Sequence, residues 1–508
     1  MKLLPPGWGF EEEYDPLKAK AKAKAGGEQA APPSQGAQAA REYLAGQLQA
    51  ACLHPQLASM VAERAVEMVK KAVDSCPEAA GIREATTGRT GLLLLCDRED
   101  IGARLLERLA KILVAAAPVA VSTQVRLSTA LGYIYDTNPL HEVCERGDAT
   151  NSLLTVLLEG LAEGGGGEEN PLAQADERGR TPLHTLLANT EIPVKDEEEG
   201  HYVGGELLEL LKSLVTAEGG LPALKMQDNE GLIPLHTMLL NPKIEGETLT
   251  EAIALLVKGI GALKKKEAAA AAQIVAAEQQ RLAEEKELQE EAEAAGEIVP
   301  APAPAPEIPR YRWHDPFLKR DKRQLGVLHT LYARAALDKR IDVDTIEALV
   351  GVADDLLGDA EGHPAAGVLE GSKPQGYLPL HTLVKSCSNH APERVASLLA
   401  PAALAHRPAA RIVDVADFDR CAAHVIADRR DVDSHMLKAL VQACPEASVA
   451  MDNRGCTPLH KLLENPMLSH AYIRQSALVE DLKLAIRERA AAIPLQALLR
   501  RRLVRTQC

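Results

Sequence analysis

A four-residue phrase that recurs along the chain constrains its fold more than any other feature. The tetrad Thr-Pro-Leu-His occurs at Thr181–His184 and again at Thr457–His460. Close variants occur at Asn138–His141, Ile233–His236 and Leu378–His381, and more divergent ones at Thr90–Leu93, Gly326–His329 and Cys421–His424. Self-similarity of this kind indicates a repeat architecture, in which each unit buries its apolar face against its neighbours.

Each position of the tetrad has a physical role at the start of a helix. Thr or Asn is a good N-cap, and the proline after it occupies the first helical position, where its missing N–H costs nothing. We expect the leucine to face inward and the histidine to bridge polar groups of neighbouring units. An upstream Asp-x-x-Gly predicts a tight turn, because glycine accepts positive φ and aspartate bonds to its own backbone; it occurs at Asp176–Gly179, Asp228–Gly231 and Asp452–Gly455.

Longer apolar segments follow the tetrads at helical spacing, as a one-sided buried helix requires. They begin at Leu153, Gly205, Leu249, Val343 and Pro392. Two similar phrases, Val73–Ala80 and Val441–Ser448, precede tetrads in opposite halves of the chain. Aromatic residues make up only 3% of the sequence, whereas alanine and leucine abound. This composition favours stacked helices, so we predict an all-α fold.

The phrases D-E-R-G-R-T-P-L-H, D-N-E-G-L-I-P-L-H and D-N-R-G-C-T-P-L-H resemble the ankyrin-repeat family. The copy at Asn138–Asp148 also keeps the glycine that the family places after the first helix. The resemblance spans roughly residues 60–485. It implies an ankyrin-like α-solenoid of about eight irregular helix-turn-helix units with short turn hairpins.

The units depart from the family pattern in length and in the residues after the histidine. Successive histidines are 36 residues apart between His424 and His460 and 52 apart between His184 and His236. Larger pairs such as Leu186-Leu187 replace the family's two small residues. We therefore expect a divergent array.

Composition divides the chain into five parts. Residues 1–35 predict a disordered tail and residues 36–263 the first half of the repeats. Residues 264–309 form a charged spacer, predicted as a solvated helix of about 40 Å followed by a Pro/Ala linker. Its apolar positions do not sustain the heptads of a coiled coil. Residues 310–488 hold the second half of the repeats, and residues 489–508 a basic C-terminal helix or tail.

Charge and cysteine usage limit the compartment and the partners. The net charge of −15 argues against nucleic acid, which needs a clustered positive face. The nine cysteines include no Cys-x-x-Cys pair, which suits a reducing compartment. The first residues lack the apolar run of a signal peptide, and no stretch is long enough to span a bilayer. We expect a monomer in the cytoplasm.

Two sets of side chains could have either a chemical role or a purely structural one. The tetrad histidines could form a metal or proton-relay row, but the resemblance favours hydrogen bonds between units. Cys421, His424, Cys444, Cys456 and His460 could bind a metal, yet both histidines already occupy tetrad positions. The sequence contains no phosphate-loop, nucleophile-elbow or zinc-binding helix motif in the structural context that such a motif requires. We predict no enzyme activity, no cofactor and no metal.

The resemblance implies a protein–protein adaptor or scaffold that binds a partner on its concave and turn face. The residues that it places there are Glu177, Arg178, Arg180, Asn189, Asn229, Glu230, Leu232, Tyr377, Lys385, Asn453, Arg454 and Glu464. Two alternatives stay open. The chain could be a structural subunit of a larger assembly, docked through the spacer helix and the basic C-terminus, or an enzyme whose site is too divergent to read.

Overall fold

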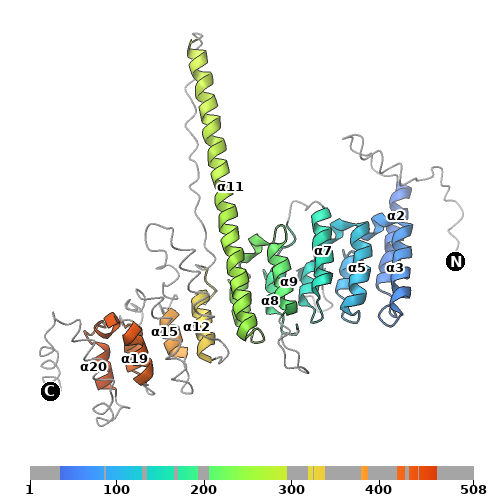
Figure 1. Ribbon diagram of the computed structural model, residues 1–508. Helices are drawn as coiled ribbons and strands as arrows, with labels where there is room; N and C mark the ends of the chain where they lie inside the picture. Colours follow the sequence, from blue (N-terminus) through green and yellow to red (C-terminus); the bar gives the residue numbers. More distant parts are fainter. Residues whose placement is uncertain are drawn as a thin grey trace.

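The computed structural model describes residues 35–84, 87–128, 134–164, 170–192, 205–294, 319–323, 325–337, 379–386, 420–429, 434–443 and 445–465. These residues are mostly helical, with a single pair of short strands among them. The predicted all-α class is therefore confirmed for this part of the chain. The helices stand side by side in one elongated array, from which α11 projects far to one side (Figure 1).

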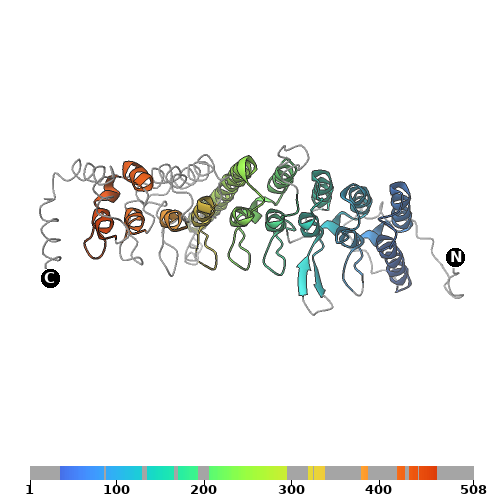
Figure 2. The same cartoon turned by 90° about the horizontal axis from the view of Figure 1, so that it is seen from below.

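Short helices form one row of the array, and every tetrad begins one of them. Successive members pack on each other along the row (Figure 2). The tetrad leucines Leu140, Leu183, Leu235 and Leu328 are buried, as predicted. These inner helices are α4 (Gly91–Cys96), α6 (Pro139–Glu145), α8 (Pro182–Ala188), α10 (Pro234–Leu240), α12 (Val327–Leu337), α15 (Pro379–Ser386), α18 (Ala422–Ala427) and α20 (Pro458–Glu464).

Longer helices form a second, outer row. Neighbours in this row pack in sequence from α3 to α11, and their apolar faces join the inner helices in one continuous core. The predicted helices that begin at Val343 and Pro392 lie outside the described residues. The outer helices are α3 (Ala62–Ser75), α5 (Ala103–Ala116), α7 (Asn151–Glu163), α9 (Gly205–Thr216), α11 (Gly246–Ala294) and α19 (Ser434–Ala443). Four of them are followed by 3-10 turns, η1 (Pro77–Gly81), η2 (Pro118–Ser122), η3 (Leu221–Lys225) and η6 (Pro445–Ser448).

Helix α2 (Gln35–Cys52) extends the inner row by one member that carries no tetrad. It packs on both α3 and α4. Leu48 and Cys52 are fully buried, whereas Tyr43 on the opposite side is 60% exposed. The array thus begins one helix pair before the first tetrad, within the range expected for the first half of the repeats.

One loop of the inner side is a true strand pair. Strands β1 (Val125–Ser128) and β2 (Ile134–Thr137) run antiparallel, with Val125 opposite Thr137. Figure 2 shows this pair projecting from the same side of the array as the other described loops that precede inner helices. The loops therefore share one edge of the molecule.

Helix α11 differs from the predicted spacer in where it begins. It runs unbroken for 49 residues, roughly 70 Å. The outer helix that follows the tetrad at Ile233–His236 and the spacer are therefore one element. No helix breaker separates Leu263, which is buried, from the lysines that follow it. The inner row continues past it, since α10 packs directly on α12. Gln35, the last residue of the predicted tail, already belongs to α2. Residues 1–34 of that tail, residues 295–309 of the spacer and linker, and the C-terminal segment at 489–508 lie outside the described residues.

The part of α11 that projects from the array, beyond Lys266, should contribute little to the stability of the array. Ile274 is 66% exposed, whereas Ile260, earlier in the same helix, is 1% exposed. We expect Ile260→Val to lower the free energy of unfolding by about 1 kcal/mol and Ile274→Val to leave it unchanged. Urea unfolding of the two variants measures both values. Equal losses would mean that the distal half of α11 is packed in solution.

Candidate interaction surface

Each Asp-x-x-Gly sequence folds into a closed turn that presents two residues at its tip. The backbone N–H of Asp176 donates to Arg180 O at 2.8 Å, and its carboxylate Oδ1 accepts from the N–H groups of Arg178 and Arg180. Gly179 has φ +75°, a left-handed value that glycine adopts without strain. The turn leaves Glu177 and Arg178 exposed at the tip.

The same turn forms at Asp228 and Asp452, as predicted, and at Asp321, where sequence reasoning missed it. Asp321 N–H donates to Leu325 O at 3.0 Å, and Leu325 N–H donates to the Asp321 carboxylate at 2.7 Å. The sequence here reads Asp-Lys-Arg-Gln and lacks the glycine used to find the others. We call the exposed second and third residues of these four turns the tip row: Glu177, Arg178, Asn229, Glu230, Lys322, Arg323, Asn453 and Arg454.

Neighbouring tips are joined by their backbones. Asn229 N–H donates to Arg178 O, and Lys322 N–H donates to Glu230 O, both at 2.7 Å. The side-chain amide of Asn229 also donates to Glu177 O at 2.7 Å. Three consecutive tips therefore have a fixed spacing, although the chain between the second and third includes all of α11.

Four tetrad histidines tie their own unit to the next through their Nε2 atoms. Every acceptor is the carbonyl that directly precedes the following tetrad. The Nε2–O distances are 2.9 Å from His141 to Arg180, 3.0 Å from His184 to Leu232, 2.9 Å from His381 to Arg420 and 2.8 Å from His424 to Cys456. The predicted bridging role is confirmed at these four junctions.

The hydrogen bonds fix the protonation state of two of these rings, those of His184 and His424. Nδ1 of His184 accepts from Thr181 N–H at 3.2 Å, so the ring proton sits on Nε2 and is donated to Leu232 O. His424 is held likewise by Cys421 N–H and Cys456 O. In His184 and His424, therefore, both ring nitrogens are hydrogen-bonded to backbone groups. Within the described ranges, no group of three or more His, Cys, Asp and Glu residues is arranged to hold a metal ion.

Burial makes the tetrad histidines sensitive to acid. It lowers the pKa of His236 to about 4. Between pH 7 and pH 5 the unfolded chain gains a proton here and the folded chain does not, so the free energy of unfolding falls as the pH falls.

Between pH 7 and pH 5, we expect the free energy of unfolding to fall by about 2 kcal/mol less in His236→Gln than in the wild type. Urea unfolding of both proteins at pH 7 and pH 5 measures the difference. Burial raises the pKa of Glu142 to about 7, which acts in the opposite sense but is common to both proteins. An unchanged pH dependence would show that His236 is protonated in the folded state.

A second series of side chains caps the C-terminal end of the preceding inner helix at seven of the described junctions, and sequence reasoning did not find it. Asn189, expected on the binding face, donates its amide to Glu145 O of α6 at 2.8 Å. Arg146 donates to Arg98 O, just beyond α4, at 2.7 Å. Arg334 of α12 donates to Leu239 O of α10 at 2.9 Å, although the whole spacer lies between them in the sequence. Arg98, Asn241, Arg429 and Asn465 act in the same way on α2, α8, α15 and α18. These donors satisfy carbonyls that a helix end leaves without an internal partner.

The structure divides the expected binding residues into exposed and engaged groups. Glu177, Arg178, Asn229, Glu230, Asn453 and Arg454 belong to the tip row, and Lys385 and Glu464 are exposed at the ends of α15 and α20. Arg180 is paired with Asp176 at 2.8 Å. Leu232 is half-buried, and its carbonyl accepts from His184. Tyr377 lies outside the described residues.

Sequence reasoning also overlooked a concentration of positive charge in the Asp321 turn. Lys319, Arg320, Lys322 and Arg323 are four cations within five residues. The side chain of Lys322 is 64% exposed and lies 3.2 Å from a Glu230 carboxylate oxygen. The run K-R-D-K-R was detectable from charge alone.

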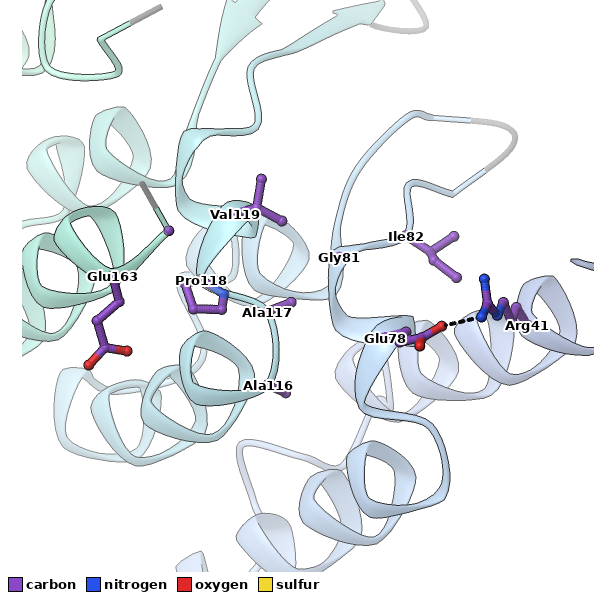
Figure 3. A pocket seen from close by; sticks show the side chains of 10 residues that line it. Arg41, Glu78, Gly81, Ile82, Ala116, Ala117, Pro118, Val119 and Glu163 are labelled. Atoms are coloured by element: carbon purple, nitrogen blue, oxygen red, sulfur yellow. Dashed lines mark ion pairs between the residues drawn. The ribbon is translucent and has the colours of Figure 1, made fainter. Parts of the chain in front are cut away.

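A groove of about 570 Å³ opens near the start of the array (Figure 3). Its lining is mostly small or apolar, and Arg41 and Glu78 form an ion pair of 2.9 Å at one side. Glu163 lines the opposite side. This lining suits an apolar side chain and brings no acid, base and nucleophile together.

No described helix is both long and apolar enough to cross a membrane. No protein-family model matches the chain. A comparison with curated proteins likewise finds no match.

Proposed function

We propose that this chain is a non-enzymatic adaptor or scaffold built as an ankyrin-like solenoid. It binds a protein partner through the tip row and the adjoining ends of the inner helices. The observation that carries the proposal is the fixed spacing of three tips by backbone hydrogen bonds while their charged side chains remain exposed. A surface ordered before binding loses less conformational entropy when a partner docks.

The repeat chemistry supports the family assignment within this proposal. The tetrad caps its own helix, its histidine reaches the next unit, and its leucine enters the core. The described cysteines are free thiols, which is compatible with a reducing compartment such as the cytoplasm. We propose that the protein acts there as a monomer.

A pull-down from source-cell lysate tests the adaptor role. The test variant carries alanine at Glu177, Arg178, Asn229, Glu230, Asn453 and Arg454. Its control carries alanine at six exposed outer-helix residues of the same net charge, Glu67, Lys70, Lys71, Glu209, Lys212 and Glu251. We expect partners to be lost with the first variant only, with matched melting curves by circular dichroism. Partners retained by both would contradict binding through these six residues of the tip row.

The projecting half of α11 favours one alternative, a structural subunit of a larger assembly. Beyond Lys266 most of its described side chains are exposed. Among the described residues, Arg281 pairs only within the helix, with Glu278 and Glu285. A subunit docked through this arm would keep its partners in the alanine variant and lose them when residues 270–294 are deleted. The two outcomes separate the adaptor from the assembly subunit.

A further inference from the structure

The turn at Asp321 differs from the other described turns in its surplus of positive charge. Asp321 is 9% exposed, and its carboxylate accepts the N–H of Leu325 inside the turn. The four cations around it extend from residue 319 to residue 323. At Asp176, by contrast, the neighbouring Arg180 pairs with the turn carboxylate. We call residues 319–323 the basic hairpin.

The backbone of the basic hairpin is fixed at the middle of the tip row. Arg320 O accepts from the side-chain amide of Gln227 at 3.0 Å, and Lys322 N–H donates to Glu230 O at 2.7 Å. The Lys322 ammonium also lies 3.2 Å from the Glu230 carboxylate. The basic hairpin therefore already pairs with one carboxylate of the chain. The exposed Arg323 has no interaction partner among the described residues.

We propose that the basic hairpin receives an acidic segment of the protein partner. This inference rests on the proposed adaptor function and names the chemistry of its ligand. The chain as a whole carries a net charge of −15, so an acidic segment is repelled by most of the surface and attracted here. None of residues 319–323 is aromatic, so the hairpin has no stacking platform for single-stranded nucleic acid.

Fluorescence anisotropy with a labelled decaglutamate peptide tests the proposal on the full chain. The test variant combines Lys322→Glu and Arg323→Glu. The control combines Lys70→Glu and Lys71→Glu, two adjacent exposed lysines of α3, and changes the net charge equally. We expect the test variant to weaken binding at least about tenfold and the control less than about twofold, with binding to wild type declining as salt rises.

In the binding experiment, three results would overturn the proposal: no binding of decaglutamate by wild type, equal weakening by both variants, or tighter binding of a ten-nucleotide oligothymidylate through the same two residues. The lysate pull-down separates this failure from failure of the adaptor role. If the alanine variant loses partners and the hairpin variant keeps them, the adaptor stands and the acidic ligand is wrong. If decaglutamate binding depends on the hairpin while the alanine variant keeps every partner, the hairpin stands and binding through the other six residues of the tip row is wrong.

Discussion

Replacing His184 with alanine should lower the free energy of unfolding by about 3 kcal/mol. The imidazole is fully buried, and it bonds both the start of its own helix, at Thr181, and Leu232 O in the next unit. Alanine would leave a cavity and a buried carbonyl without its donor. Because stability in a repeat array depends on the interfaces between neighbours, the loss should also make unfolding less cooperative.

Urea unfolding followed by circular dichroism measures both effects. His54→Ala is the control, because the His54 ring makes only a local bond, with Gln56 N–H at 3.2 Å, in an exposed turn. We expect the control to change the free energy of unfolding by less than about 0.5 kcal/mol. Equal losses in the two variants would show that the bond from His184 to Leu232 does not join the units in solution.

The starts of the inner helices were predictable because their signals are local. An N-cap, a proline and an inward leucine lie within four residues, and the tetrads at Thr181 and Thr457 begin helices as expected. Helix α2 has no such signal, and only the spacing of Ala45, Leu48 and Cys52 marks its buried face. Composition placed a boundary at residue 264, but the backbone continues through it because no residue there breaks a helix.

The engaged residues of the candidate surface could not be identified from the sequence. Asn189 bonds a carbonyl 44 residues earlier, and Arg334 bonds one 95 residues earlier. Such partners depend on how units stack, which repeat spacing alone does not give. Exposure at the tips was predictable, since an Asp-x-x-Gly turn must project its two middle residues. The Asp321 turn shows the limit of that rule, because the aspartate closes the turn without a glycine in the last position.

The contact between neighbouring tips can be tested with two glycines of similar backbone conformation. Gly231 has φ +80° and Gly455 has φ +72°, so alanine is strained at both. A β-carbon on Gly231 would also lie 2.9 Å from Arg320 O and 3.0 Å from Asp321 Cα, whereas a β-carbon on Gly455 would meet nothing within 4 Å. Comparing alanine substitutions at Gly231 and Gly455 therefore separates the cost of backbone strain, common to both, from the cost of the clash between neighbouring tips, which only Gly231 has.

We expect Gly455→Ala to lower the free energy of unfolding by about 1 kcal/mol and Gly231→Ala by about 3 kcal/mol. The excess at Gly231 arises because backbone atoms of the basic hairpin must move, which also lengthens the bond from Lys322 N–H to Glu230 O. Urea unfolding measures the two losses, and hydrogen exchange at the Lys322 amide should accelerate only in Gly231→Ala. Equal losses with unchanged exchange would mean that the tips do not touch in solution. The tip row would then present no ordered surface, and the adaptor proposal would lose its main support.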